Sequence, residues 1–348
     1  MLEIKVGRNN SDFRTITEAV QAVPYEESAV VYIEAGTYEE KIFCEKKDIT
    51  FLGEGIGRTV LQFSDKAAEV MPDGSKRGTF RSYTAFFGGE KVTVKNMSIR
   101  NNAGDGRIAG QALAVYADAS KCYFENVELF GHQDTLFMSP LPVTERQKNG
   151  FLGPRVMTDR RLTKQYYKDC RIYGDVDFIF GGADVVFDNC SIICNNRRAV
   201  DTSADVLGDQ KDMKAQSGNE RFINGYVTAG CGISSNIGMI FRKCDVRGEA
   251  GCDKESVFLG RPWRDEAKAV FLDCTMDETI APERFSGWGA VDKPQPGTYY
   301  GEYGTRDDKG ALTDLSKKNS WVKDVDADEA DKISSLADEI INEVMKKI

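Results

Sequence analysis

Two aspartates occupy equivalent positions in two copies of a short repeat. The segment 129–137 reads Leu-Phe-Gly-His-Gln-Asp-Thr-Leu-Phe, and the segment 172–180 reads Ile-Tyr-Gly-Asp-Val-Asp-Phe-Ile-Phe. Asp134 and Asp177 coincide when the two are superimposed. Asp177 interrupts an apolar run, where an unpaired carboxylate would cost on the order of several kcal/mol. If the two repeats stack as neighbouring strands, the two acids lie about 4.8 Å apart.

Two carboxylates at that distance cannot both ionise freely unless a cation pairs with one of them. Arg261 is the candidate cation, in the segment Leu-Gly-Arg-Pro-Trp at 259–263, where Pro262 stiffens the chain. Such a cation would keep one aspartate anionic as a nucleophile and leave the other protonated as a general acid. A lone buried Arg–Asp pair is more often structural, but two stacked acids favour catalysis.

Two glutamines near these acids suit acyl transfer. Gln133 precedes Asp134, and Gln111 lies in Gly-Gln-Ala-Leu-Ala at 110–114. Both amides can donate hydrogen bonds to a developing oxyanion, whereas the transition state of glycosidic cleavage is cationic. These glutamines therefore favour ester chemistry over glycoside hydrolysis.

The single histidine, His132, narrows the choice of mechanism. Any Ser-His-Asp or Cys-His mechanism would have to use it, and the chain has no Gly-x-Ser-x-Gly motif to supply a nucleophile elbow. We expect His132 to pack beside the site, with a general-base role as the lesser alternative.

The acids must be positioned by a repeating backbone, and six segments share one pattern. They run apolar, polar, polar, small or soft apolar, polar, apolar, except that the last has Leu272 in second place. Asn or Asp usually precedes the central residue, where it suits a bend or a side-chain ladder. The segments are 94–99, 124–129, 167–172, 187–192, 241–246 and 271–276. Their spacing predicts an all-β fold, a right-handed parallel β-helix forming a single domain over residues 1–348.

Helical periodicity is confined to the two ends of the chain. Residues Thr15–Val23 and Ile333–Ile348 each carry apolar side chains on one face. We expect the first to cap the open end of the solenoid and the second to pack along its side; plain surface helices are the alternative.

Cysteine placement argues against disulfides and metals. Cys170, Cys190, Cys244 and Cys274 take the central position of their repeats, so they should point inward as reduced, small hydrophobes. The chain has no CxxC pair with zinc-like partners, and we expect no metal and no cofactor.

The charge and hydropathy of the chain limit the kinds of partner that it can bind. A net charge of −9 argues against nucleic-acid binding. The sequence carries neither a signal peptide at its start nor an apolar stretch long enough to span a membrane, so we expect a cytoplasmic monomer, or a secreted one if a leader has been removed.

A basic cluster lies in an insertion between two repeats, at 138–164. Seven basic residues gather over 142–168, and they form either a solvated loop or a wall that attracts an acidic polymer. They are Arg146, Lys148, Arg155, Arg160, Arg161, Lys164 and Lys168. A second polar insertion at 202–222 should also flank the groove.

Taken together, several motifs in order along the chain resemble those of pectin methylesterases, carbohydrate esterases that demethylate the homogalacturonan of pectin in cell walls. The resemblance covers nearly the whole chain. It rests on Gly-Thr-Tyr-Glu-Glu at 36–40, Gly-Gln-Ala-Leu at 110–113, Gly-His-Gln-Asp-Thr-Leu at 131–136, Gly-Asp-Val-Asp-Phe-Ile-Phe-Gly at 174–181 and Leu-Gly-Arg-Pro-Trp at 259–263. The fold of that family is a right-handed parallel β-helix, which agrees with the repeat.

The resemblance also implies residue roles. Asp177 would attack the methyl-ester carbonyl, and Asp134 would protonate departing methanol and then activate water. Gln133, assisted by Gln111, would stabilise the tetrahedral anion, while Arg261 orients Asp177. Contact with the sugar chain is implied for Thr84, Gln111, Val176, Phe180, Arg261 and Trp263. The implied ligands are pectin or methylated oligogalacturonates.

Three departures from the common family pattern lie at or beside the groove. His132 stands where Tyr or Asn is usual, Asp175 stands where Thr is usual, and the loop after Phe137 is longer than in plant enzymes. They leave the reaction intact but put the subsite preference in doubt. Two other classes stay open: a polygalacturonase-like β-helix glycosidase, whose Asn-Thr-Asp, Gly-His-Gly and Arg-Ile-Lys signatures are missing here, and a non-catalytic solenoid that only binds pectin.

Overall fold

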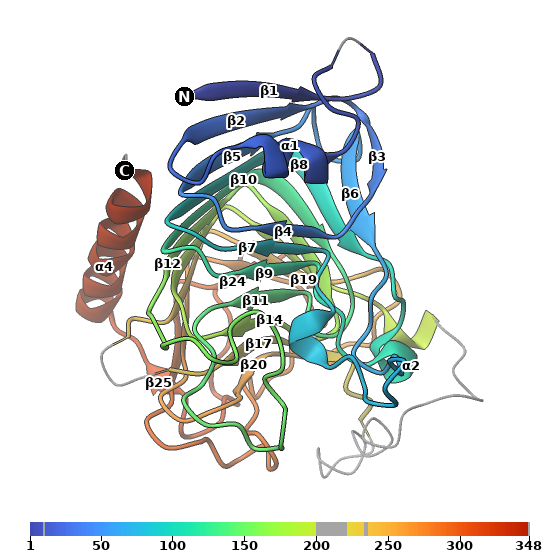
Figure 1. The fold of residues 1–348 in the computed structure, drawn as a ribbon. Helices are drawn as coiled ribbons and strands as arrows, with labels where there is room; N and C mark the ends of the chain where they lie inside the picture. The colour runs from blue at the N-terminus through green and yellow to red at the C-terminus, as the bar shows by residue number, and fades with distance from the viewer. Residues whose placement is uncertain (10, 200–220, 233–235, 347–348) are drawn as a thin grey trace.

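The computed structural model describes residues 1–9, 11–199, 221–232 and 236–346, and these form the parallel β-helix that the repeats predict. Successive turns place their strands side by side, as Figure 1 shows. One face of the coil is a seven-stranded parallel sheet, which carries the candidate site. Its strands are β4 (Ile42–Cys44), β7 (Ala85–Phe87), β9 (Val115–Ala117), β11 (Leu136–Met138), β14 (Val176–Gly181), β17 (Gly225–Gly230) and β20 (Val257–Pro262).

The other faces belong to one bent sheet of eighteen strands, whose strand pairs are also parallel. These strands are β1 (Leu2–Val6), β2 (Ser28–Ile33), β3 (Gly36–Glu39), β5 (Asp48–Leu52), β6 (Thr59–Phe63), β8 (Lys91–Asn101), β10 (Lys121–Phe130), β12 (Lys164–Lys168), β13 (Arg171–Gly174), β15 (Asp184–Asp188), β16 (Ser191–Cys194), β18 (Met239–Arg242), β19 (Asp245–Gly248), β21 (Lys268–Leu272), β22 (Thr275–Met276), β23 (Tyr299–Tyr303), β24 (Arg306–Asp307) and β25 (Lys323–Asp324).

The bend between those faces comes from the residue before the centre of each repeat. This residue is left-handed in all six repeats, with φ of 52° or 53°, a region that Asn and Asp tolerate better than other residues with a side chain. The six are Asn96, Asn126, Asp169, Asn189, Lys243 and Asp273. The side chains also stack: Asn126 Nδ2 donates to Asn96 Oδ1 at 2.8 Å, and Asn189 Nδ2 donates to Asp169 Oδ1 at 2.6 Å. Both the bend and the ladder that the repeat predicts are present.

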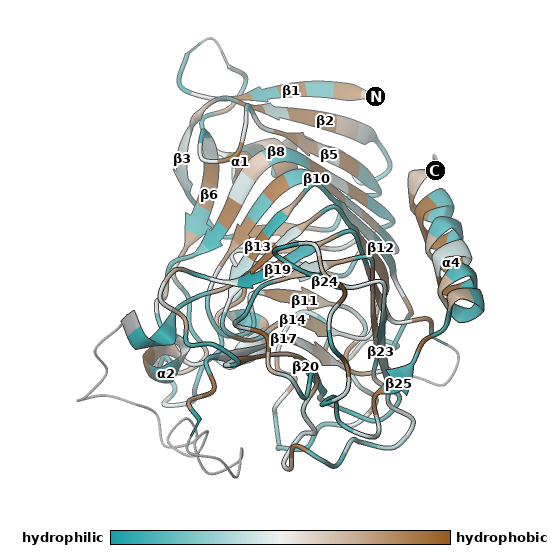
Figure 2. Ribbon diagram, turned by 180° about the vertical axis from the view of Figure 1, so that it is seen from behind, coloured by the Kyte–Doolittle hydropathy of each residue, from teal (hydrophilic) through white to brown (hydrophobic). Residues whose placement is uncertain are grey.

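The core lies inside the coil, and it is built from stacks of equivalent side chains. One stack comprises the rings of Phe124, Tyr167, Phe187, Phe241 and Phe271, with successive centroids 4.3 to 4.8 Å apart. Beside it, the cysteines at the repeat centres point inward as predicted, and all nine cysteines of the chain are free. Figure 2 shows the resulting alternation of apolar and polar residues along the strands.

The helices at the two ends pack as the periodicity predicts, with one difference in length. Helix α1 (Ile16–Ala22) buries Ile16, Ala19 and Val20 against the end of the core. Helix α4 (Ala327–Met345) packs along β10, β12 and β15, and Figure 1 shows it standing beside the coil. It begins at Ala327 rather than Ile333, because Asp326 caps it by accepting a hydrogen bond from the backbone N–H of Glu329.

The described residues also include three short helical turns: η1 (Thr79–Arg81), α2 (Gly106–Ala109) and η2 (Arg197–Ala199). No helix in the described ranges has the length and apolarity needed to cross a bilayer. The second predicted insertion, at 202–222, lies outside the described residues except for its last two positions.

Thiol titration tests the inward stacking of cysteines. All of them except Cys252 are buried, and burial raises the pKa of the Cys252 thiol to about 11, so even this thiol should react slowly. We expect an aromatic disulfide reagent to detect about one thiol in the native protein and all nine after denaturation. Several rapidly reacting native thiols would contradict the packing.

Lys243 offers a test of the left-handed bend, because it is the one member of the six without a ladder-forming side chain. In the stack it lies between Asn189 and Asp273. Lys243→Asn should raise the free energy of unfolding by roughly 0.5–1 kcal/mol, since Asn adopts this conformation at lower cost. Urea denaturation measures the gain. Lys243→Gln removes the same charge without the conformational preference, so an equal gain in both variants would refute the explanation.

Candidate active site

Two stacked turns hold the two aspartates, one turn before β11 and one at the start of β14. The backbone N–H of Asp175 donates to the carbonyl of His132 at 3.0 Å, and the N–H of Asp134 donates to the carbonyl of Val176 at 3.0 Å. Strand register continues this alignment, with Phe137 paired to Phe180. Asp134 and Asp177 are therefore equivalent positions in adjacent turns, as the repeat predicts.

Local backbone distortion turns both carboxyl groups outward. Asp134 and Asp177 have φ of 64° and 53°, in the sparsely populated left-handed region. Asp177 also lies at an irregularity of β14, where the register against β17 shifts between Val176 and Ile179. Such a bulge re-aims side chains next to functional sites.

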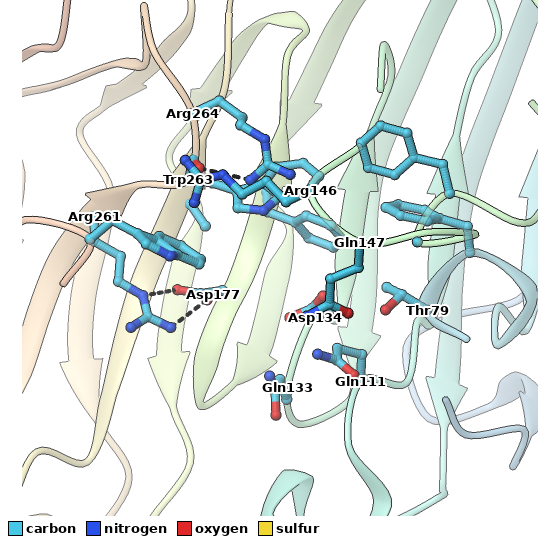
Figure 3. A pocket seen from close by; sticks show the side chains of 16 residues that line it. Thr79, Gln111, Gln133, Asp134, Arg146, Gln147, Asp177, Arg261, Trp263 and Arg264 are labelled. Carbon is cyan, nitrogen blue, oxygen red and sulfur yellow. Dashed lines mark hydrogen bonds and ion pairs between the residues drawn. The ribbon is translucent and has the colours of Figure 1, made fainter. Parts of the chain in front are cut away.

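Arg261 reaches Asp177 across one intervening strand. It lies on β20, paired with Ala229 of β17, which in turn pairs with Phe180 of β14. Its Nε and Nη2 donate to Asp177 Oδ1 and Oδ2 at 2.8 and 2.7 Å, the bidentate geometry of a strong charge-assisted pair. Figure 3 shows this fork.

Aromatic rings hold the Arg261 guanidinium in place. Its central carbon lies 4.1 Å from the ring centroid of Tyr226 and 4.3 Å from that of Trp288, so cation–π contacts add to the ion pair. Burial alone would lower the pKa of Arg261, but the carboxylate of Asp177 more than offsets this and raises it. The arginine therefore stays charged beside Asp177.

Asp134 is in the opposite situation. Burial, and then the negative charge of Asp177, raise the pKa of Asp134 well above its usual value, and Arg261 only partly opposes them. The two acids thus divide as their sequence predicts: Asp177 is ion-paired, and Asp134 is poised to hold a proton. One can act as a nucleophile and the other as an acid.

A cavity of about 340 Å³ opens over both acids, within the usual range for small-molecule sites. Most of the residues singled out from the sequence line it together: Gln111, Gln133, Asp134, Asp177, Phe180, Arg261 and Trp263. No group of three or more His, Cys, Asp or Glu side chains suited to a metal ion occurs in the described part of the chain.

The two glutamines reach the cavity by way of α2. A Cβ on Gly106, the first residue of α2, would come within 2.6 Å of Gln133 Cβ, so only glycine permits this close packing. Gly110 ends α2 with φ of 70°, which directs Gln111 back toward the acids. Figure 3 shows both amides on the same side of Asp134. They can donate to an oxygen atom bound there.

Two residues with an implied sugar contact, Thr84 and Val176, lie outside the lining of this cavity. Thr84 is fully buried and its Oγ1 donates to the carbonyl of Arg100, while Val176 is buried against Tyr226 and Phe258. Neither residue is among those that line the cavity. Thr79, at the start of η1, lies at the cavity instead.

His132 lies beside the cavity rather than in it, as expected. Its Nδ1 is 3.3 Å from Asp175 Oδ2, and Asp175 Oδ1 accepts the backbone N–H of Val176 at 2.7 Å. Burial lowers the pKa of His132, but the hydrogen bond and charge of Asp175 outweigh it and raise the pKa overall. The two unusual residues of the motifs therefore form one pair.

Apart from Arg146, which belongs to the basic cluster, sequence reasoning missed several residues that line the cavity. The outer face of the site sheet carries Tyr116, Phe137 and Phe180, and the insertion folds onto it through Leu141 and Phe151. The further lining residues are Thr79, Phe80, Arg146, Gln147, Gly150, Phe151, Ala229, Arg264 and Trp288.

The basic cluster of the insertion was the one sequence feature that pointed to any of these lining residues. In the structure, its members lie in different places. Arg146 lines the cavity, whereas Arg155 pairs with Glu45 and Asp118 away from it.

Comparison with known proteins finds pectinesterases. The family model described as Pectinesterase matches residues 3–147 and 160–337, leaving out the tip of the insertion. Probable pectinesterase 8 of Arabidopsis thaliana is 31% identical over 324 residues, covering 90% of this chain and 68% of that protein. Probable pectinesterase/pectinesterase inhibitor 64 of the same plant is 30% identical over 314 residues, with 86% and 44% covered. The chain thus spans less than half the length of several such relatives.

Solved structures share the fold. Pectin methylesterase from carrot superimposes with a TM-score of 0.74 at 24% identity, covering 99% of this chain and 96% of that one. Pectin methylesterase PemA from Erwinia chrysanthemi gives a TM-score of 0.67 at 24% identity, with 91% and 92% covered.

Because the environments of the two acids differ, replacing each acid by Asn should have opposite effects on the stability of the protein. The raised pKa of Asp134 penalises folding at any pH where the unfolded carboxyl is ionised, and this penalty disappears below its ordinary pKa of about 4. Asp134→Asn should therefore raise the thermal midpoint at pH 8 and have little effect near pH 3. Asp177→Asn should lower stability by about 3 kcal/mol at pH 8, because it breaks a buried ion pair. Calorimetry at the two pH values measures both; a destabilising Asp134→Asn at pH 8 would contradict the assignment.

Proposed function

This chain belongs to the pectinesterase family, and from that premise we propose that it hydrolyses methyl esters of galacturonate units in pectin, releasing methanol and de-esterified pectate. One observation carries the proposal. Asp177, held by Arg261 in a bidentate ion pair, faces a cavity shared with Asp134, whose pKa is raised, and with two glutamine amides. That set supplies a nucleophile, an acid and oxyanion donors in one place.

The first half-reaction uses Asp177 as nucleophile. A carboxylate oxygen of Asp177 attacks the ester carbonyl carbon, and the carbonyl oxygen becomes an anion that Gln133 and Gln111 stabilise by hydrogen bonds. Collapse of this intermediate breaks the bond to the methoxy oxygen. Asp134 donates its proton to that oxygen, so methanol leaves and an anhydride links Asp177 to the sugar acid.

The second half-reaction reverses the proton transfer. Asp134, now ionised, takes a proton from water while the water oxygen attacks the anhydride at the carbonyl carbon that belongs to the sugar acid. The bond to Asp177 breaks, which restores its carboxylate and releases the galacturonic acid unit. Asp134 is protonated again and Arg261 has kept Asp177 in position throughout, so the cavity is ready for another ester.

We propose pectin or methylated oligogalacturonates as the substrate, bound by a monomer. Two pectin methylesterase structures that share this fold are described as complexes with hexasaccharides. Trp263 supports a similar occupant here, because its ring borders the cavity next to Phe180, at a centroid distance of 5.8 Å. A flat ring at the rim of the acids suits a pyranose.

A glycosidase and a non-catalytic pectin binder are the competing functions. A retaining glycosidase also uses two closely spaced carboxylates, but its transition state is cationic and gains nothing from two amide donors. A binder would have no use for the pairing of Asp177 with Arg261 at the cavity.

Product analysis on methylated pectin separates the three functions. We expect methanol release without new reducing ends; reducing ends alone would indicate a glycosidase, and neither product would indicate a binder. Asp177→Asn should abolish methanol release, because the amide is no longer an anionic nucleophile. Circular dichroism at low temperature verifies that this less stable variant is folded. Arg171→Gln, an exposed change on β13 away from the cavity, serves as the control. A folded Asp177→Asn variant with near-native methanol release would refute the assigned nucleophile.

A further inference from the structure

The pair formed by His132 and Asp175 joins the two turns that carry the acids, and the proposed reaction gives it no role. His132 lies two residues before Asp134 in one turn, and Asp175 lies two residues before Asp177 in the next. The distance from His132 Nδ1 to Asp175 Oδ2 is 3.3 Å. A side-chain link therefore crosses from turn to turn within two residues of each acid.

Both members of the pair also hold the backbone of these turns. The carbonyl of His132 accepts hydrogen bonds from the backbone N–H of Asp175 at 3.0 Å and from Thr135 Oγ1 at 3.2 Å. Asp175 Oδ1 accepts the backbone N–H of Val176 at 2.7 Å, and the carbonyl of Val176 accepts the N–H of Asp134 at 3.0 Å. These contacts form one network, so a shift of either side chain would act on the backbone beside an acid.

The network has little room to relax. Among the described residues, His132 is the only side chain bonded to the Asp175 carboxylate, which is almost completely buried. A Cβ on Gly174 would come within 2.7 Å of the carbonyl oxygen of His132, and one on Gly225 within 2.0 Å of that of Asp175. Neighbouring backbone thus lies directly against both members of the pair. Because a buried carboxylate without a partner is costly, Asp175 depends on the imidazole.

The charges around His132 keep its imidazole protonated to a higher pH than usual. Burial lowers the pKa of His132, but the hydrogen bond and the charge of Asp175 raise it, and the charges of Asp105 and Glu249 add to this effect. Asp105, the N-cap of α2, is itself paired with Arg107, and Glu249 lies just after β19. Within the described residues, Asp175 is thus the one acid that bonds to the imidazole.

The two turns need a link of this kind. Two neighbouring carboxylates repel each other, and both Asp134 and Asp177 occupy left-handed backbone conformations that the surroundings must hold. The proposed reaction places an oxygen of Asp177 at the ester carbon and the amide of Gln133 at the carbonyl oxygen of the same ester. The separation of the two turns must therefore stay fixed, since a displacement of about 1 Å can cost about 100-fold in rate.

We propose that His132 and Asp175 are positioning residues, which fix the turn of Gln133 and Asp134 against the turn of Asp177 through their side-chain link. The inference rests on the proposed function, because it assigns the pair to that reaction. Neither residue lines the cavity. Loss of the link should therefore slow the chemical step and leave substrate binding nearly unchanged.

NMR spectroscopy tests whether the link exists in solution. His132 is the only histidine of the chain, so the imidazole signal of a protein without a histidine tag reports on this pair alone. We expect a titration midpoint above the ordinary value of about 6.5, because the hydrogen bond and charge of Asp175 outweigh burial. The midpoint should fall in Asp175→Asn, where only Asp105 and Glu249 still oppose burial. A midpoint that Asp175→Asn leaves unchanged would overturn the link.

Methanol release from a methylated oligogalacturonate tests the effect on the reaction. His132→Phe and Asp175→Ala each break the link, and each should lower kcat about tenfold while KM changes less than about twofold. The double variant should be no slower than the slower single one, because both changes break the same link.

His132→Gln separates positioning from general-base catalysis. Its amide N–H can donate to Asp175 as the imidazole does, so most of the rate should remain. A general base would be lost in this variant as completely as in His132→Phe.

Asp188→Asn is the matched control for stability. Asp188 forms a bidentate ion pair with Arg242 between paired positions of β15 and β18, and Arg242 also bonds to Asp338 of α4, away from the cavity. Breaking this pair should lower the thermal midpoint, as the variants of the link do, but leave kcat unchanged.

Three results decide the outcome. Folded His132→Phe and Asp175→Ala variants with native kcat would overturn the positioning role, and so would an equal loss of kcat in Asp188→Asn. Absence of methanol from the native protein would overturn the proposed function instead, while the imidazole titration would still decide on the link. If Asp175→Ala fails to fold, His132→Phe and His132→Gln carry the test, because the His132 side chain is 20% exposed.

Discussion

Hydrogen bonding between parallel strands in register is the constraint on which this structure depends. Each turn of the coil must place its residues directly over their equivalents in the preceding turn, at the spacing of neighbouring strands. The same constraint stacks Phe187 on Phe241 in the core and Asp134 beside Asp177 at the surface. The pair of acids that we propose as catalytic thus arises from the repeat itself: two turns that each carry an acid at one position must bring the two acids together.

The proximity of the two acids has an energetic cost, and this cost affects Asp134 more than Asp177. Two desolvated carboxylates repel each other, and both occupy left-handed backbone conformations that most residues avoid. Arg261 stabilises Asp177 more than Asp134, because its fork is bonded to Asp177 and acts on Asp134 only through its charge. Burial, and then the negative charge of Asp177, raise the pKa of Asp134. The destabilisation and the proton that the proposed reaction needs are therefore two aspects of one arrangement, as in other sites where activity opposes stability.

Features that recur along the chain could be predicted from the sequence, and features that occur once could not. The stacked acids, the bend at Asn126 and the inward Cys190 each follow from position within a repeat. Periodicity places the start of α4 too late because the first turn is polar and the apolar pattern begins only at Ile333, although Asp326 provides a capping signal. The contacts expected of Thr84 come from motif resemblance, which carries no information on which way a side chain points. Trp288 lies outside every repeat, so no period could place its ring against Arg261.

The position of the cavity follows from how the outer face of the site sheet changes along the coil. Successive strands present Tyr116, Phe137 and Phe180 in one row, and this apolar row must be covered from water. The insertion covers it, with Phe151 packed against Phe80 at a centroid distance of 5.8 Å. One strand further the row changes to Ala229, and then to Arg261. The methyl group of Ala229 does not fill the space that a ring would occupy. The insertion therefore leaves a cavity there, with Ala229 at its base and Arg261 at its side. The insertion that shields this apolar row from water therefore also brings Arg146 to the cavity. Part of the positive charge at the cavity thus comes from the segment that departs most from the repeat.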